Sequence, residues 1–264
     1  MPRTQHLSLL REFVRRDFEG RYAGSVLGFL WSMIQPLWQL LLFGFIFGVL
    51  MKIPLDGEPT STFWIFLFAA LMPWLALQEG IQRSTTAITD NANLVKKIHF
   101  PSEILVATVV IAAVIHQAIA GALFLVALAI VGELDLSGLP LLFLALPLQL
   151  SLTTGMGLFV AASNIYLRDV SQLQGMLLMA WFYFTPIVYP MAMVRQVEDH
   201  GQLLEGMLLL NPATALVDLY RQAFLGGRLA DVEGLASLAV CAVVALGGGW
   251  WLFRKLKPAF ADEL

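Results

Sequence analysis

The residue types that most often carry catalysis are few and scattered in this sequence. The four histidines, His6, His99, His116 and His200, stand far apart, and no His-Glu-x-x-His or Cys-x-x-Cys spacing predicts a metal site. No Gly-x-x-x-x-Gly-Lys-Ser/Thr loop is present to hold nucleotide phosphates. His116 lies in an apolar run without the serine turn that an intramembrane protease needs, so we interpret it as a neutral histidine bonded to a neighbouring helix. These patterns argue against an enzyme and against a metal site.

Glu79 is the best candidate for a carboxylate of the kind that couples ion movement to transport. Arg83 follows it by one helical turn, and such an i, i+4 pair at a hydrated helix end is ordinary. A charge at the centre of a bilayer would cost about 2.5–3.5 kcal/mol. Since no second buried acid supports a proton relay, an ion-coupled secondary transporter is an alternative and not the first interpretation.

Aromatic side chains are the most distinctive chemical group. Their flat apolar faces and polar tips suit sugar rings that slide past, although lipid-facing positions would also favour them. The run from Trp181 to Phe184 points in several directions around a helix, so part of it must face protein or a pore. The candidate lining residues of a channel are Trp31, Trp38, Phe43, Trp74, Trp181, Phe182, Tyr183 and Phe184.

The composition predicts that these residues lie on membrane-spanning helices. Of the 264 residues 58% are hydrophobic and 13% are charged, whereas soluble domains average about 25% charged residues. About 20 residues of helix cross a bilayer, and six uncharged runs are long enough. We predict an all-α integral membrane protein with one transmembrane domain over residues 1–264 and six spans, at about 26–51, 60–82, 104–131, 139–163, 170–194 and 235–254. Gly247 to Gly249, in the last span, predict close helix packing.

The distribution of positive charge predicts that both termini are cytoplasmic. Of the 16 Lys and Arg residues, this topology leaves only Lys52, Arg195, Arg221 and Arg228 outside. The net charge of −3, without a basic face, argues against a nucleic-acid partner.

Three stretches that do not span are also informative. Residues 7–22 carry apolar side chains at helical spacing opposite charged ones, which predicts an amphipathic helix on the cytoplasmic membrane surface, held either by lipids alone or beside a partner. Residues 91–101 form a short cytoplasmic loop with an apolar ridge of Leu94, Val95, Ile98 and Phe100, exposed to the membrane surface or to a partner. Residues 195–225 contain a short apolar run broken by Asn211 and Pro212, so they predict either re-entrant helices or an ordinary loop helix.

Several short motifs, in order, resemble the membrane subunit of polysaccharide-exporting ABC transporters, most closely the O-antigen type called Wzm and more distantly the capsule and teichoic-acid permeases. The residues that carry this resemblance are Arg16-Asp17, Arg21-Tyr22, Ser25 to Gly28, Trp31, Pro36, Asn91 to Pro101, Arg168-Asp169, Phe184 to Ile187, Asn211-Pro212 and Tyr220-Arg221. One departure is Ala70, where the family pattern has glycine before Leu71.

The resemblance implies a homodimer that pairs with two copies of a separate ATPase in the bacterial inner membrane and exports a lipid-linked polysaccharide. ATP and magnesium would bind the partner, and this chain would bind no cofactor. The spans matching one and five would line the channel, and residues 195–225 would form re-entrant helices. Export of a capsular polysaccharide, or of drugs or other lipids, is the alternative.

The resemblance also implies roles for two cytoplasmic segments. The expected coupling helix that contacts the ATPase consists of Asn93, Leu94, Val95, Lys96, Lys97, Ile98, His99, Phe100 and Pro101. The expected interface helix beside it presents Arg11, Arg15, Arg16, Asp17, Arg21 and Tyr22.

Overall fold

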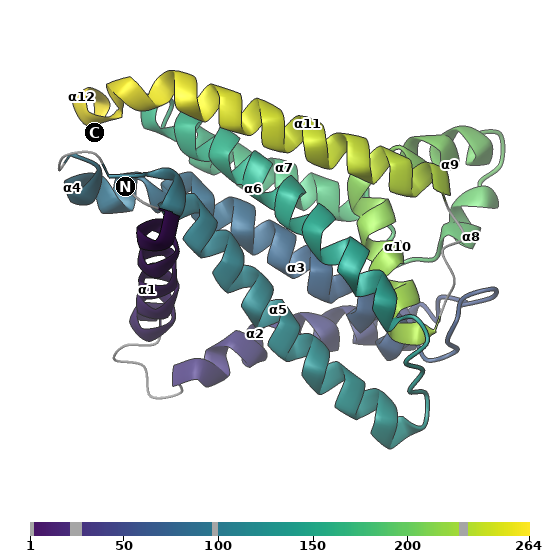
Figure 1. Cartoon of the computed structure of the whole chain (residues 1–264). Helices are drawn as coiled ribbons and strands as arrows, with labels where there is room; N and C mark the ends of the chain where they lie inside the picture. The colour runs from purple at the N-terminus through teal and green to yellow at the C-terminus, as the bar shows by residue number, and fades with distance from the viewer. Residues whose placement is uncertain (1–2, 22–27, 97–99, 227–231) are drawn as a thin grey trace.

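A computed structural model describes residues 3–21, 28–96, 100–226 and 232–264, and every regular element in these ranges is helical (Figure 1). The described part of the chain contains no strand, so the predicted all-α fold is confirmed there. The helices pack side by side in one bundle, with α1, α4 and α12 at one end and α8 and α9 at the other.

Four helices are long and apolar enough to cross a membrane. They coincide with four of the predicted spans, since each charge-free run forms one helix and the charges lie at its ends. Their bounds are α3, Phe63–Ala87; α5, Glu103–Val131; α6, Leu142–Tyr166, with a 3-10 turn η4, Leu139–Leu141, before it; and α11, Val232–Leu256.

Helix α3 forms the centre of the bundle. Its side chains are buried around most of its circumference, including Phe66, Leu67 and Trp74, and it packs against α5, α6, α7 and α10. Small residues bring α6 close to it: a Cβ atom added to Gly80 would lie 2.5 Å from Thr153 Cγ2 on α6. This central position explains why the most apolar stretch of α3 has no lipid-facing side.

Helices α6 and α11 are also in close contact (Figure 1). A Cβ atom added to Gly249 would lie 2.0 Å from the carbonyl oxygen of Gly155, so neither backbone leaves room for a larger side chain. Gly247 and Gly248 have no other atom within 4 Å of such a position. The close packing predicted for the three glycines is therefore found at Gly249 alone.

The first predicted span, 26–51, is helical over its described part. It comprises η1, Gly28–Leu30; α2, Trp31–Phe43; and η2, Gly44–Leu50, which is π-helical. Gly44 and Gly48 allow η2 to lie directly on the rings of Trp64 and Phe63 at the start of α3.

The fifth predicted span, 170–194, differs in the structure, because α7, Val170–Tyr183, ends eleven residues early. The cause is local: Pro186 disfavours a helical conformation at Thr185 and removes a backbone donor. The chain then continues as a buried non-helical stretch to Pro190 and a short helix α8, Met191–Arg195.

The segment predicted at 195–225 contains two helices, α9, Gly201–Leu209, and α10, Pro212–Leu225, that meet at an angle of 80°. The bend lies at Asn211, whose side chain accepts a hydrogen bond from Ala213 N at 3.0 Å and so caps α10, with Pro212 at its first position.

The remaining elements gather at the end of the bundle where both termini lie (Figure 1). They are α1, Arg3–Arg21; η3, Thr89–Asn91; α4, Ala92–Val95; η5, Lys257–Ala259; and α12, Phe260–Glu263. The helix predicted at 91–101 is shorter than expected: α4 ends at Val95, Phe100 and Pro101 are not helical, and Lys97, Ile98 and His99 lie outside the described residues.

Candidate functional site

The interface helix α1 is held on the bundle by an ion pair between Asp17 and Arg83 of α3. Arg83 Nη1 donates to Asp17 Oδ2 at 3.0 Å, and Nη2 donates to Asp17 Oδ1, which makes the pair bidentate. Arg83 Nη1 also lies 3.7 Å from Glu79 Oε1. The Glu79–Arg83 pair predicted from the sequence is therefore confirmed, but the direct hydrogen bonds of Arg83 go to α1.

Aromatic contacts fix the two ends of the same helix against α5 and the loop before it. The ring centroids of Phe13 and Phe100 lie 5.6 Å apart, and those of Phe18 and His116 lie 4.7 Å apart. His116 Nδ1 lies 3.9 Å from Glu79 Oε1 on α3. His116 thus contacts two other helices, in line with its interpretation as a packed histidine.

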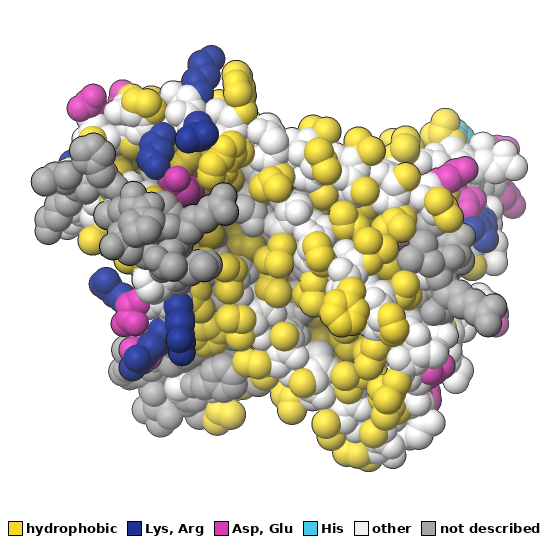
Figure 2. Space-filling model, viewed as in Figure 1, with side chains coloured by type: hydrophobic (Ala, Val, Ile, Leu, Met, Phe, Trp, Pro, Cys, Tyr) yellow, Lys and Arg dark blue, Asp and Glu magenta, His cyan; other side chains and the backbone are white. Residues whose placement is uncertain are grey.

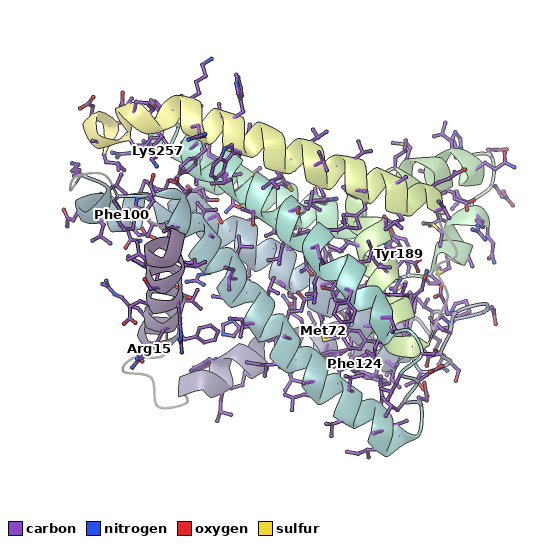
Figure 3. All side chains as sticks on the ribbon, in the orientation of Figure 1. Arg15, Met72, Phe100, Phe124, Tyr189 and Lys257 are labelled. Atoms are coloured by element: carbon purple, nitrogen blue, oxygen red, sulfur yellow. The ribbon has the colours of Figure 1, made fainter. Side chains whose placement is uncertain are left out.

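The charged face of α1 is exposed as predicted at Arg11, Arg15 and Arg16, while Asp17 is turned toward Arg83. Figure 3 shows Arg15 at the rim of α1, pointing away from the bundle. The side chain of Arg21 and the whole of Tyr22 lie outside the described residues.

The predicted coupling segment is only partly an exposed ridge. Asn93 and Lys96 are exposed and Leu94 is half-buried, whereas Pro101 is buried. Val95 packs between two apolar clusters, and Phe100 packs against Phe13. The expectation that Val95 and Phe100 project outward is wrong, because both side chains attach this loop to the helices beneath it.

The C-terminal tail, which sequence reasoning did not single out, also supports this segment. Phe260 is 1% exposed and packs in the cluster around Ile88, to which Val95 and Leu264 also contribute. Lys257 Nζ lies 2.6 Å from Glu103 Oε2 at the start of α5; both Phe100 and Lys257 are labelled at this end in Figure 3. Six residues of tail are too short to show a periodic pattern, although the bulky Phe260 after a charged stretch was a signal.

The aromatic residues predicted to line a channel divide into two groups. Trp74 and Phe182 belong to the core, at 1% and 8% exposure, and Phe43 is half-buried and stacks on Phe182 with centroids 5.3 Å apart. The prediction is wrong for Trp74 and Phe182, since both rings pack inside the protomer. The exposed members are Trp31 and Trp38 on α2 with Tyr183 and Phe184 at the end of α7.

These exposed aromatics belong to wider apolar faces. On α2 the exposed positions include Leu37 and Leu41, and on α7 they include Leu173, Met176 and Leu177. The stacking of Phe43 on Phe182 places the two helices next to each other. Together they form one uncovered apolar surface, which we call the α2–α7 face.

Polar side chains of the following segment satisfy the backbone that the early end of α7 leaves unpaired. Asn211 Nδ2 donates to the carbonyl of Phe184 at 2.9 Å, and its Oδ1 accepts from Trp181 Nε1 at 2.8 Å. Arg221 Nη2 donates to the carbonyl of Ile187 at 2.9 Å. Non-helical backbone at membrane depth is tolerated where protein groups satisfy it in this way. Trp181 therefore has a structural contact in addition to its half-exposed ring.

Arg221 was predicted as an exposed cation of an outer loop, but it is 4% exposed. Its guanidinium carbon lies 3.7 Å from the centre of the Phe66 ring, a distance typical of a cation–π contact. The sequence signal was its spacing on α10, where Val217 and Phe224 on the same face are also buried.

A buried polar network joins three further helices in the interior. Gln149 Nε2 on α6 donates to Gln117 Oε1 on α5 at 2.8 Å, and Tyr220 Oη on α10 donates to Gln149 Oε1 at 2.5 Å. Gln117 also borders a cavity of about 370 Å³ between α2, α3 and α5, and a second cavity of about 610 Å³ lies between α1, α3 and α5.

The arrangement has an exposed cytoplasm-type charged end, a long apolar middle and an uncovered aromatic face, but no catalytic group of residues was recognised in it. In the ranges that the structure describes, no group of three or more His, Cys, Asp or Glu side chains is placed to hold a metal ion. Binding and movement fit this geometry better than chemistry on a substrate.

Comparison with known proteins agrees with this view. The profile of the ABC-2 type transporter family matches residues 8–225. The O-antigen export system permease protein RfbA of Myxococcus xanthus is 30% identical over 98% of this chain and 96% of its own length. RfbA of Klebsiella pneumoniae is 26% identical over 97% and 95%, and the polysialic acid transport protein KpsM of Escherichia coli is 25% identical over 92% of each chain.

The resemblance predicted from the short motifs is thereby confirmed over almost the whole length. The match includes α1 and the stretch around Asn211, so it extends beyond the long apolar helices, whose composition alone would match many membrane proteins. The chain belongs to the ABC-2 type transporter family of membrane proteins.

Proposed function

We propose that this chain is the membrane permease of an ATP-driven exporter of a lipid-linked, O-antigen-like polysaccharide across the bacterial inner membrane. The observation that carries the proposal is the similarity to an O-antigen export permease, at 30% identity over 98% of the chain. Capsular polysaccharide is the second candidate, because the polysialic acid transport protein is also similar along most of the chain.

In this proposal the permease itself is no enzyme and acts with a separate ATPase. The family implies such a partner, and the sequence contains no phosphate loop of its own. ATP and magnesium would bind the ATPase. Two copies of each subunit would assemble, and the uncovered α2–α7 face supports the pairing of two permeases because exposed apolar surface of this extent calls for a covering partner.

Six membrane crossings remain the proposed topology. The four long helices are joined by the helical stretch 28–50 and by α7, and the bent α9–α10 pair would form the re-entrant element on the outer side. Both termini lie at one end of the bundle in Figure 1. In Figure 2 most Lys and Arg side chains of the visible face gather at that end, which supports a cytoplasmic location for it.

The coupling contact would involve Asn93, Leu94 and Lys96, whose side chains reach the surface. Val95, Phe100 and the C-terminal tail would act by fixing this loop to α3 and α5. The glycan path would follow the α2–α7 face, where Trp31, Trp38, Tyr183 and Phe184 could stack against passing sugars.

The test is deletion of the gene in its own bacterium and complementation with the wild-type gene. We expect loss of the surface polysaccharide and accumulation of its lipid-linked precursor inside the cell, both reversed by complementation. Reversal should also require a nucleotide-binding subunit that copurifies with the permease and has an intact phosphate loop.

The outcome separates the remaining functions. If the missing polysaccharide is the O-antigen of lipopolysaccharide, the first candidate holds, and if it is the capsule, the second holds. Unchanged surface polysaccharide would favour export of drugs or other lipids. Activity that persists without any ATPase would instead indicate a secondary transporter.

A further inference from the structure

The cavity of about 370 Å³ between α2, α3 and α5 has a wall rich in uncharged hydrogen-bonding groups. Gln39 of α2, Gln78 and Gln82 of α3 and Gln117 of α5 all border it, and Met72, labelled in Figure 3, lies on its apolar part. Its volume falls near the lower end of the range of about 300–1,000 Å³ that is usual for small-molecule sites.

Two amide atoms in this wall are buried without a hydrogen-bond partner among the described residues. They are Nε2 of Gln117, whose side chain is more than nine-tenths buried, and Oε1 of Gln39. An unpaired buried polar group costs about 1–3 kcal/mol. One atom is a donor and the other an acceptor, so a hydroxyl group, which accepts and donates at once, is the group that satisfies both.

The charged residues of the wall are already compensated. Arg83 is bonded to Asp17 and lies 3.7 Å from Glu79, and His116 lies 3.9 Å from the same carboxylate. The cavity therefore has no uncompensated cation to attract a phosphate group. Its chemistry favours a neutral ligand with several hydroxyl groups.

The donors of the wall are also held in place. Trp74 Nε1 donates to Gln78 Oε1 at 3.0 Å, which leaves the amide hydrogens of Gln78 available, and Gln149 holds Gln117 through its Oε1 at 2.8 Å. A site whose donors are fixed by neighbouring groups is organised before the ligand arrives, which lowers the entropy lost on binding.

We propose that this cavity is a binding site for one or two neutral sugar residues within each protomer, apart from the α2–α7 face. The proposal rests on the proposed function, since a polysaccharide supplies the sugar. Gln39 would accept a hydrogen bond from a sugar hydroxyl, and Gln117 would donate one.

The probe is an alkyl maltoside with a photoreactive diazirine on its sugar, added to the purified permease–ATPase complex in lipid nanodiscs. After illumination, adducts are located by mass spectrometry of peptides. We expect adducts on the peptides of α2, α3 and α5 that border the cavity. Free maltose should displace them, and inorganic phosphate should not.

The variants Gln39→Leu and Gln117→Leu remove the two unpaired groups with little change in volume, and each should lower this labelling by roughly fivefold to tenfold. The matched control is Gln202→Leu on exposed α9, which should leave the labelling unchanged. Copurification of the ATPase with each variant shows that the variant is folded, and Gln39→Asn serves where Gln39→Leu does not copurify.

Equal labelling by an alkyl diazirine that carries no sugar would mean that the cavity holds water or lipid chains only, and would overturn the proposal. So would displacement by phosphate, or labelling that the Gln→Leu changes leave intact. Polysaccharide export by the wild-type chain is measured in parallel: failure there refutes the proposed function, whereas normal export with unaltered labelling of the variants refutes this site alone.

Discussion

At the scale of single residues, the bond between Asp17 and Arg83 decides where the interface helix lies. The two side chains are 16% and 30% exposed, so the pair is partly shielded from water. By contrast, Arg15 and Glu19 on the same helix form a pair whose side chains are 69% and 64% exposed. A shielded bidentate pair contributes more to stability than an exposed one.

We predict that Arg83→Gln and Asp17→Asn each release α1 from the bundle, because each leaves the partner charge unpaired. The cost should be about 1–3 kcal/mol, measured as faster limited proteolysis within α1 and a lower unfolding temperature in detergent. The double swap Asp17→Arg with Arg83→Asp should recover part of the loss. Arg15→Gln is the control and should change little; an equal effect there would show that the shielded pair has no special role.

The same residues show the limits of sequence reasoning at this scale. The contact of Glu79 with Arg83 follows from helical spacing, so it could be predicted. Asp17 is 66 positions away from Arg83, and nothing local marks them as partners. Likewise Trp38 and Trp74 are both tryptophans in apolar runs, and only packing makes the first exposed and the second buried.

At the scale of helices, the contact between α6 and α11 depends on one glycine of three. A methyl group at Gly249 would collide with the backbone of Gly155, whereas one at Gly247 meets open space. Helix–helix association in membranes relies on such close approach of small residues, because apolar burial adds little where lipid already surrounds the helices.

We therefore predict opposite effects of the same substitution two residues apart in α11. Gly249→Ala should force the helices apart and lower the unfolding temperature of the detergent-solubilised protein. Gly247→Ala should be neutral, or stabilising by up to about 1 kcal/mol from the higher helix propensity of alanine. If both variants unfold alike, the close contact at Gly249 is not a source of stability.

The long helices were predictable because an uncharged run can be compared directly with the thickness of a bilayer. The end of α7 was not, since the uncharged run continues to Val194 while the helix stops at Tyr183. The proline at 186 was the available signal. The C-terminal helix α12 and the attachment of Val95 arise from contacts between distant segments, which hydropathy does not record.

At the scale of the whole molecule, both termini lie at one end and the α8–α9 region lies at the other (Figure 1). The sequence predicted this from charge alone, and the order of the helices follows from their lengths. The pairing of exposed faces between two copies depends on packing, so it stays a proposal.

This arrangement predicts which positions a membrane-impermeant maleimide can reach in spheroplasts. In a Cys241→Ala background, cysteines introduced at Asp56 and Gln202 should react in intact spheroplasts. Those introduced at Ser8 and Asp262 should react only after lysis, because they lie at the cytoplasmic end. The protein without cysteine is the control, and reaction of Ser8→Cys in intact spheroplasts would contradict the topology.

The early end of α7 has a consequence for the surrounding bilayer. Its 14 residues, at about 1.5 Å each, extend for about 21 Å, whereas the hydrocarbon layer is about 30 Å thick. Against lipid, this helix would create a hydrophobic mismatch that thins the bilayer locally or brings non-helical backbone close to acyl chains. A second permease covering the helix would relieve the mismatch. The bilayer itself would then favour assembly of the pair, even where the facing side chains make few specific contacts.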